Sequence, residues 1–291
     1  VLCQLPDRFL RSVLLERAPE VHLPQAGRYA TGLIFLPQQS TERRAVKYRI
    51  AAIAAEEGLD VLVWRPVEVR REALGAAARE AAPIIEQLVL VASAGSVLNQ
   101  DHLERAAFRT RKRMQHETNA YAPSLSSHPI VYKGMATTLQ LSAVYPGLLA
   151  ERFEALFAVA ASRYSTNTFP SWHLAQPLRM VAHNGEINTV RGNRNWMRAR
   201  EGQLESAVLG DLTPLLPICS PGGSDSASFD EVLELLVLSG RSLPHALAMM
   251  VPEAWELERG LSDELHDFLE YHSLIMEPWD GPAAMIATDG R

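Results

Sequence analysis

Cysteine is scarce in this chain of 291 residues: only Cys3 and Cys219 occur, far apart in the sequence. Two such cysteines exclude a disulfide framework and a four-cysteine zinc site. Few cysteines are typical of proteins in a reducing compartment, and we therefore expect a cytoplasmic protein. The sequence gives us no candidate metal ligands.

Basic residues are fewer than acidic ones: 28 Lys and Arg against 34 Asp and Glu give a net charge of −6. Nucleic-acid binders usually present a basic face, so no nucleic-acid partner is expected. We expect the one basic cluster, residues 105–113, to be a solvated helix face. No apolar run is long enough to cross a bilayer, and we expect no membrane partner. With 47% hydrophobic and 21% charged residues, the composition is that of an ordinary soluble globular chain.

Hydrophobic spacing and turn residues predict helices that alternate with strands, which favours a layered arrangement of both. Thr41 and Ser228 are the expected N-caps of two helices, and Gly58 is the expected C-terminal cap of the first. The predicted strands are 30–36, 59–69, 88–91, 130–135, 156–161, 178–182 and 283–286. Residues 9–17 form an amphipathic segment, and the predicted helices are 41–57, 102–117, 138–145, 193–205 and 228–238.

Residues 156–192 hold the polar groups that suggest a ligand site. Arg163 and Thr166 follow the apolar run 156–161, and Asn184 and Gly185 follow the run 178–182. If the two runs are neighbouring strands, these groups surround one cleft that can hold a small anion. A guanidinium is a planar, bidentate partner for a carboxylate.

Each of these residues also has an ordinary structural interpretation. An Arg after a strand is most often a surface residue, and Asn184-Gly185 is a common hairpin turn. The functional interpretation is that the Asn184 amide and the Gly185 N–H form an oxyanion hole. Asp225, in the segment GGSDSAS, is either an auxiliary helix cap or a carboxylate that pairs with a substrate ammonium group. Together these groups suit acyl chemistry on an α-amino acid, but the sequence shows no clear nucleophile.

Four separated motifs carry a family resemblance that extends over essentially the whole chain. They are VYKGM, RYSTNTFPSWHLAQPLRMVAHNGEINTVRGN, GGSDSASFDEVLELL and HSLIMEPWDGPAAMIATDGR. The chain resembles the class II glutamine amidotransferase domain of the glutamate synthase large subunit. The resemblance implies an N-terminal-nucleophile fold, an α+β four-layer αββα sandwich, with residues 1–291 forming one partial domain that is incomplete at both ends.

The resemblance also implies an enzyme that releases ammonia from L-glutamine for transfer to 2-oxoglutarate, forming glutamate in nitrogen assimilation. It assigns Arg163 and Thr166 to the glutamine carboxylate, Asp225 to its ammonium group, and Asn184 and Gly185 to the oxyanion hole. No cofactor is expected in this segment. FMN and an iron–sulfur cluster are expected in the synthase region of the same chain, and a small reductase subunit is a further candidate partner.

Two departures from the family pattern bear on activity. Ala161 stands where the family usually has His, two residues before Arg163. The nucleophilic N-terminal Cys of the family is expected upstream of Val1, because VLCQLP aligns with a core strand that follows the nucleophile. We expect neither Cys3 nor Cys219, a small side chain in a loop, to be that nucleophile, and we expect this polypeptide alone to be inactive. The alternatives are a degenerate domain that binds glutamine or serves in assembly, and another class II amidotransferase.

Overall fold

The computed structural model describes residues 1–162, 170–252, 255–257 and 260–291. The chain forms two compact units. Unit 1 comprises Val1–Ala182 with Gly290–Arg291, and unit 2 comprises His183–Asp289. Strands and helices occur in both units. The structure is thus of the mixed α and β class, as the sequence predicts.

Unit 1 is built on a three-stranded antiparallel sheet in the order β2–β4–β3. Its strands are β2 (Tyr29–Leu36), β4 (Ile84–Ala92) and β3 (Leu59–Pro66). Side chains alternate between the two faces of a strand, and both faces of β2 are buried. Ala30, Ile34 and Leu36 therefore contribute to one core cluster, while Leu33 and Phe35 contribute to another.

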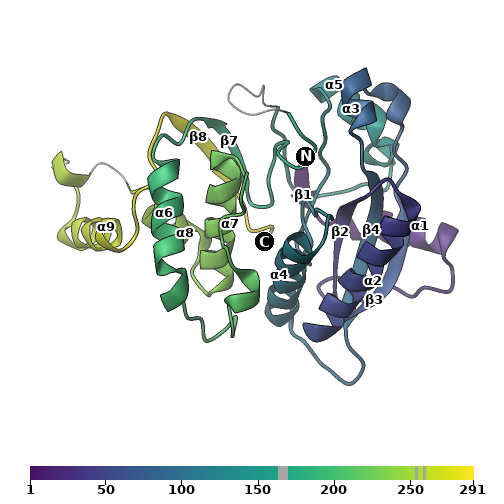
Figure 1. The fold of residues 1–291 in the computed structure, drawn as a ribbon, viewed down its shortest axis with the longest axis horizontal. Coiled ribbons are helices and arrows are strands. Elements are labelled where there is room, and N and C mark those ends of the chain that lie inside the picture. The colour runs from purple at the N-terminus through teal and green to yellow at the C-terminus, as the bar shows by residue number, and fades with distance from the viewer. Residues whose placement is uncertain (163–169, 253–254, 258–259) are drawn as a thin grey trace. The chain divides into compact units, whose positions relative to one another are not determined.

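One face of this sheet is covered by α2 (Ser40–Glu56) and α4 (Gln100–Glu117) (Figure 1). Glu57 joins the two helices by accepting hydrogen bonds from Arg109 at 2.5 Å and from Arg113 at 2.7 Å. The prediction of a solvated basic face is consequently wrong for part of α4, because Arg111, Lys112 and Arg113 are buried. Charge alone does not reveal a basic side chain that an acidic partner on another helix holds in the interior.

A second, smaller sheet of unit 1 has the order β5–β1–β6. It consists of β5 (Pro129–Val131), β1 (Leu2–Gln4) and β6 (Ala158–Val159), and it shares a core with the other face of the first sheet. Gly32 on β2 lets the backbone at Ser124 pack closely against this strand, since a Cβ at Gly32 would lie 1.8 Å from the carbonyl oxygen of Ser124. The remaining helices of unit 1 are α1 (Asp7–Arg17), α3 (Ala76–Glu80) and α5 (Thr138–Val144), with single 3₁₀ turns at Arg71–Ala73 and Pro146–Leu149.

Unit 2 contains most of a two-stranded sheet and a set of helices packed in sequence order. The sheet pairs β7 (Val181–Gly185), which begins in the last residues of unit 1, with β8 (Ala283–Ala287). The helices are α6 (Val190–Arg200), α7 (Asp225–Leu238), α8 (Leu243–Met250) and α9 (Asp263–Ile275), with 3₁₀ turns at Glu201–Gln203, Thr213–Leu215 and Trp255–Leu257. Helices α6 and α7 run side by side (Figure 1). Phe229 of α7 packs edge-on against Trp279 with ring centroids 5.6 Å apart.

Several predicted boundaries are confirmed and others need correction. Gly58 ends α2 with φ of +78°, as expected, but Thr41 lies inside that helix and not at its cap. The helix expected at 228–238 begins at Asp225, because Ser224 accepts a hydrogen bond from Ala227 N–H and caps it. The runs 156–161 and 178–182 are not neighbouring strands, since β6 pairs with β1 whereas β7 pairs with β8. Among the described residues, no helix combines the length and apolar character of a membrane span.

Candidate functional site

Asn184 and Gly185 are the last two residues of β7, and Asn184 is exposed. Gly185 has φ of +117°, and a Cβ at this position would lie 2.0 Å from the carbonyl oxygen of Pro282. Only glycine fits here, because it tolerates the positive φ and has no Cβ. A two-residue hairpin is excluded, since the strand that pairs with β7 lies about a hundred residues later. The Asn184 amide therefore lies at a strand end fixed by a close backbone contact.

Asp225 is the first residue of α7, and its carboxylate reaches the turn that follows β7. Oδ2 accepts a hydrogen bond from the backbone N–H of Ile187 at 3.1 Å, and Oδ1 accepts one from Ser226 N–H at 2.7 Å. A carboxylate is favourable at the positive end of a helix. The predicted residues Asn184, Gly185 and Asp225 thus lie in one part of unit 2. Asp225 is hydrogen-bonded to Ile187, which lies two residues after Gly185.

A second connection between β7 and α7 comes from two residues that the sequence does not single out. The Nδ1 atom of His183 lies 2.7 Å from Oγ of Ser226, and both side chains are buried. His183 directly precedes Asn184, and Ser226 directly follows Asp225. The pair therefore fixes the relative position of the strand end and the helix start. The only sequence signal for it is that each member adjoins a predicted site residue.

The loop before α7 is held by Arg194 of α6. Its guanidinium donates to the carbonyl oxygens of Gly223 at 2.7 Å and Ser224 at 2.9 Å, and to Oγ of Ser228 at 2.8 Å. Ser228 is therefore a partner of Arg194 and not the cap that its sequence pattern predicts. Through these bonds Arg194 holds the first turn of α7, where Asp225 lies.

In unit 1, a buried ion pair secures the segment that leads into β7. The guanidinium of Arg179 contacts the carboxylate of Glu104 on α4, which also accepts hydrogen bonds from Ser126 Oγ at 2.6 Å and Ser127 N–H at 2.7 Å. Burial acts to raise the pKa of Glu104, but Arg179 and these hydrogen bonds outweigh it and lower the pKa below its usual value. Glu104 is consequently an ionised partner inside the core.

Arg163 and Thr166, the predicted partners of a substrate carboxylate, lie outside the described residues. Cys3 lies at the centre of β1, where it is only 1% exposed and is paired with Ile130 of β5 and Ala158 of β6. Burial raises the pKa of its thiol to about 11. A thiol in this state is a weak nucleophile. Cys219 is partly exposed.

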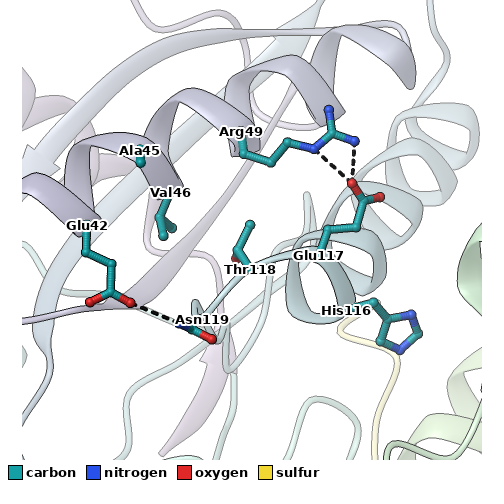
Figure 2. A pocket seen from close by; sticks show the side chains of 8 residues that line it. All are labelled: Glu42, Ala45, Val46, Arg49, His116, Glu117, Thr118 and Asn119. Atoms are coloured by element: carbon teal, nitrogen blue, oxygen red, sulfur yellow. Dashed lines mark hydrogen bonds and ion pairs between the residues drawn. The ribbon is translucent and has the colours of Figure 1, made fainter.

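A shallow pocket of about 370 Å³ in unit 1 lies between α2 and the end of α4 (Figure 2). Two pairs of its polar groups bind each other: the Arg49 guanidinium points to Glu117, and Asn119 donates to Glu42 at 2.9 Å. Within the described ranges, one set of three residues, His266, Asp267 and Glu270, brings possible metal-ligating atoms within 4.8 Å of one another. Two of the three are exposed on α9, as acidic surface groups commonly are, so this set alone does not define a metal site.

The Asp225 carboxylate at the start of α7 thus accepts a hydrogen bond from Ile187, two residues after the end of β7 at Gly185. The family model for class-II glutamine amidotransferases matches residues 1–291. The chain therefore belongs to the class-II glutamine amidotransferases.

Individual relatives show which members of this family the chain is similar to. The chain is 41% identical to the glutamate synthase [NADPH] large chain of Bacillus subtilis, covering 100% of this chain and 19% of that protein. It is 40% identical to the glutamate synthase [NADH] of Saccharomyces cerevisiae, covering 100% and 14%, respectively. It is 41% identical to the chloroplastic ferredoxin-dependent glutamate synthase of Oryza sativa, covering 89% and 17%. The chain thus spans less than a fifth of the length of these relatives.

Proposed function

We propose that this chain is the amidotransferase part of a glutamate synthase, which releases ammonia from L-glutamine for addition to 2-oxoglutarate. The observation that carries the proposal is the identity of about 40%, over 89% to 100% of the chain, to glutamate synthases with different electron donors in their names. A likeness shared by all three favours the amidotransferase reaction as the common activity.

Within this function, the Asn184 amide and the Gly185 N–H donate to the oxyanion that forms when the glutamine amide is attacked. The fixed end of β7 supports this role, because an oxyanion hole works best when its donors are already positioned. Asp225 binds the α-ammonium group of glutamine, and Arg163 binds the α-carboxylate with help from Thr166. The bonds from Ile187 and Ser226 support the role of Asp225, since they hold its carboxylate beside the strand end.

The finer architecture belongs to the same proposal: residues 1–291 form one domain based on a four-layer αββα sandwich. Its support is in unit 1, where α2 and α4 cover one sheet and the other face of that sheet shares a core with the second sheet. The partners are a synthase region of the same protein, in which FMN and an iron–sulfur cluster act, and a small reductase subunit. The place of action is the cytoplasm. We assign no residue of this chain to either cofactor.

The test compares two nitrogen sources in the full-length protein, with glutamate formation as the readout. Asp225→Asn should lower kcat/KM for glutamine about tenfold or more, because the charge-assisted bond to the ammonium group is lost. Activity with free ammonium should be unchanged. Asp263→Asn is the matched control, since Asp263 is also the first residue of a helix behind a serine cap but is exposed.

Two results would contradict the proposal. Equal loss of both activities in Asp225→Asn would make this residue structural. Ammonia release from glutamine without any glutamate formed from 2-oxoglutarate would assign the chain to another class II amidotransferase.

A further inference from the structure

Arg65 on β3 is a buried cation in unit 1 with an unusual set of partners. Only 8% of the residue is exposed. Its Nε and Nη2 atoms both donate to Oε1 of Gln87, at 2.9 and 2.5 Å, and Nη1 lies 3.5 Å from the carbonyl oxygen of Pro66. All of these partners are uncharged. The guanidinium is held in place, but its charge is not balanced by an adjacent anion.

Two other buried guanidinium groups of unit 1 have carboxylate partners. Arg113 contacts Glu57, and Arg179 contacts Glu104. For Arg65, in contrast, the described part of the chain provides no carboxylate within ion-pair distance. Burial lowers the pKa of Arg65; Tyr132 partly opposes this lowering, and the charge of Arg17 adds to it. Keeping such a charge away from water is costly unless a counter-charge joins it.

The guanidinium borders a pocket of about 180 Å³ between β3, α1 and the segment around Tyr132. Tyr132 lines the same pocket and is 3% exposed; its ring packs against Tyr145 and Phe153. The hydroxyl of Tyr145 donates to the carbonyl oxygen of Lys133 at 2.9 Å, whereas no residue in the described ranges hydrogen-bonds the hydroxyl of Tyr132. A buried hydroxyl normally has a partner. The pocket therefore presents two polar groups, Arg65 and Tyr132, that can both bind a ligand.

The rest of the pocket wall decides what kind of ligand fits. Phe9, Val13 and Val67 give it an apolar side. The acidic residues that border the pocket, Glu16 and Glu68, are both exposed, and Glu68 is paired with Arg70. They lie where water screens their charge, whereas the buried guanidinium is screened much less.

We propose that this pocket binds a small monocarboxylate that carries a short apolar chain. The carboxylate accepts hydrogen bonds from the Arg65 guanidinium and from the Tyr132 hydroxyl, and the apolar chain contacts Phe9 and Val13. A guanidinium matches a carboxylate in shape as well as in charge. The site shares no residue with Asn184, Gly185 or Asp225, and it therefore does not depend on the assignment of the glutamine site.

The experiment is isothermal titration calorimetry of the full-length protein with 3-methylbutanoate as the probe. Wild type should bind it saturably, with a Kd on the order of 1 mM, as suits so small a ligand. The neutral 3-methylbutanamide should bind at least tenfold more weakly. Arg65→Gln should abolish binding. Arg8→Gln is the control, because Arg8 lies on α1 in an exposed ion pair with Glu154.

Tyr132→Phe keeps the proposal testable if Arg65→Gln does not fold, since it removes one oxygen and leaves the ring. It should weaken binding of 3-methylbutanoate about fivefold to tenfold. The proposal is wrong if the wild-type protein does not bind the carboxylate saturably, or if the amide binds equally well. It is also wrong if Tyr132→Phe binds like wild type, or if inorganic phosphate binds and the carboxylate does not.

Discussion

The Nδ1 atom of His183 lies 2.7 Å from Oγ of Ser226. His183 directly precedes Asn184 in the sequence, and Ser226 directly follows Asp225. This contact joins the end of β7 to the start of α7 at the position where the candidate glutamine site is formed. This buried contact adds to the hydrogen bond between Ile187 and Asp225 in joining two elements that are about forty residues apart in the sequence.

Ser226→Ala removes this bond while leaving Asp225 and Asn184 in the sequence. We expect a loss of about 1–3 kcal/mol in the free energy of unfolding, because a buried hydrogen bond is broken. We also expect a lower kcat with glutamine, since one of the two links between the strand end and the helix start is lost. Chemical denaturation and steady-state kinetics measure the two effects. Ser273→Ala, at a partly exposed position on α9, should change neither.

Asn184→Ala tests the oxyanion role directly. Losing one donor to the oxyanion should lower kcat with glutamine by about a hundredfold or more, with little change in KM. Asn119→Ala is a suitable control, because it removes only the exposed bond to Glu42. An effect confined to KM would show that Asn184 positions the substrate and does not stabilise the oxyanion.

Gly185→Ala should disrupt unit 2. The new methyl group would overlap the Pro282 carbonyl oxygen, and the residue would also have to keep φ at +117°. We expect a loss of several kcal/mol, within the range of severe single substitutions. Gly192→Ala in α6 is the matched control: it meets open space and should stabilise that helix by about 0.5–1 kcal/mol. Thermal unfolding of both variants separates these outcomes, and equal melting temperatures would contradict the account of Gly185.

Glu104→Gln should lower the stability of unit 1 by about 3–5 kcal/mol at neutral pH, because the buried Arg179 loses the negative charge that it contacts. The folded-state pKa of Glu104 is depressed, so its contribution is complete above the unfolded value of about 4.3 and is lost as the pH falls below it. The difference in the free energy of unfolding between wild type and variant should therefore be constant from about pH 6 to about pH 8, and it should shrink below about pH 5. A difference that does not change with pH would show that Glu104 is protonated in the folded protein.

Cys3→Ala should leave glutamine-dependent activity unchanged and cost about 1 kcal/mol of stability, since a buried sulfur is lost from the core. In native protein at pH 8, iodoacetamide should modify the partly exposed Cys219 much faster than Cys3. Loss of activity in Cys3→Ala without loss of structure would mean that Cys3 takes part in catalysis.

The sequence predicts most local structure of unit 1, because hydrophobic spacing and turn residues act over short distances. β2 and the Gly58 cap of α2 are examples. It predicts long-range pairing poorly: β7 pairs with β8 instead of lying beside β6, since register across many residues leaves no local signal. Helices α8 and α9 were not predicted at all.

The same reasoning explains the outcome for the site. Asp225, Asn184 and Gly185 carry unusual local chemistry in the sequence, and the structure brings them into one part of unit 2. His183, Ser226 and Arg194 were missed because their roles arise only when distant segments pack together. Arg163 and Thr166 lie outside the described residues, so their roles stay predictions.

The pairing of β7 with β8 also has a consequence for synthesis of the chain. The sheet β2–β4–β3 uses residues 29–92 and can form early, whereas the end of β7 gains its partner only after residue 287 has been made. At about 5–20 residues per second, a ribosome needs roughly 5–20 s to translate the hundred residues between the two strands. During that interval β7 lacks its partner strand β8, and the edge of β7 that pairs with β8 stays open until β8 emerges.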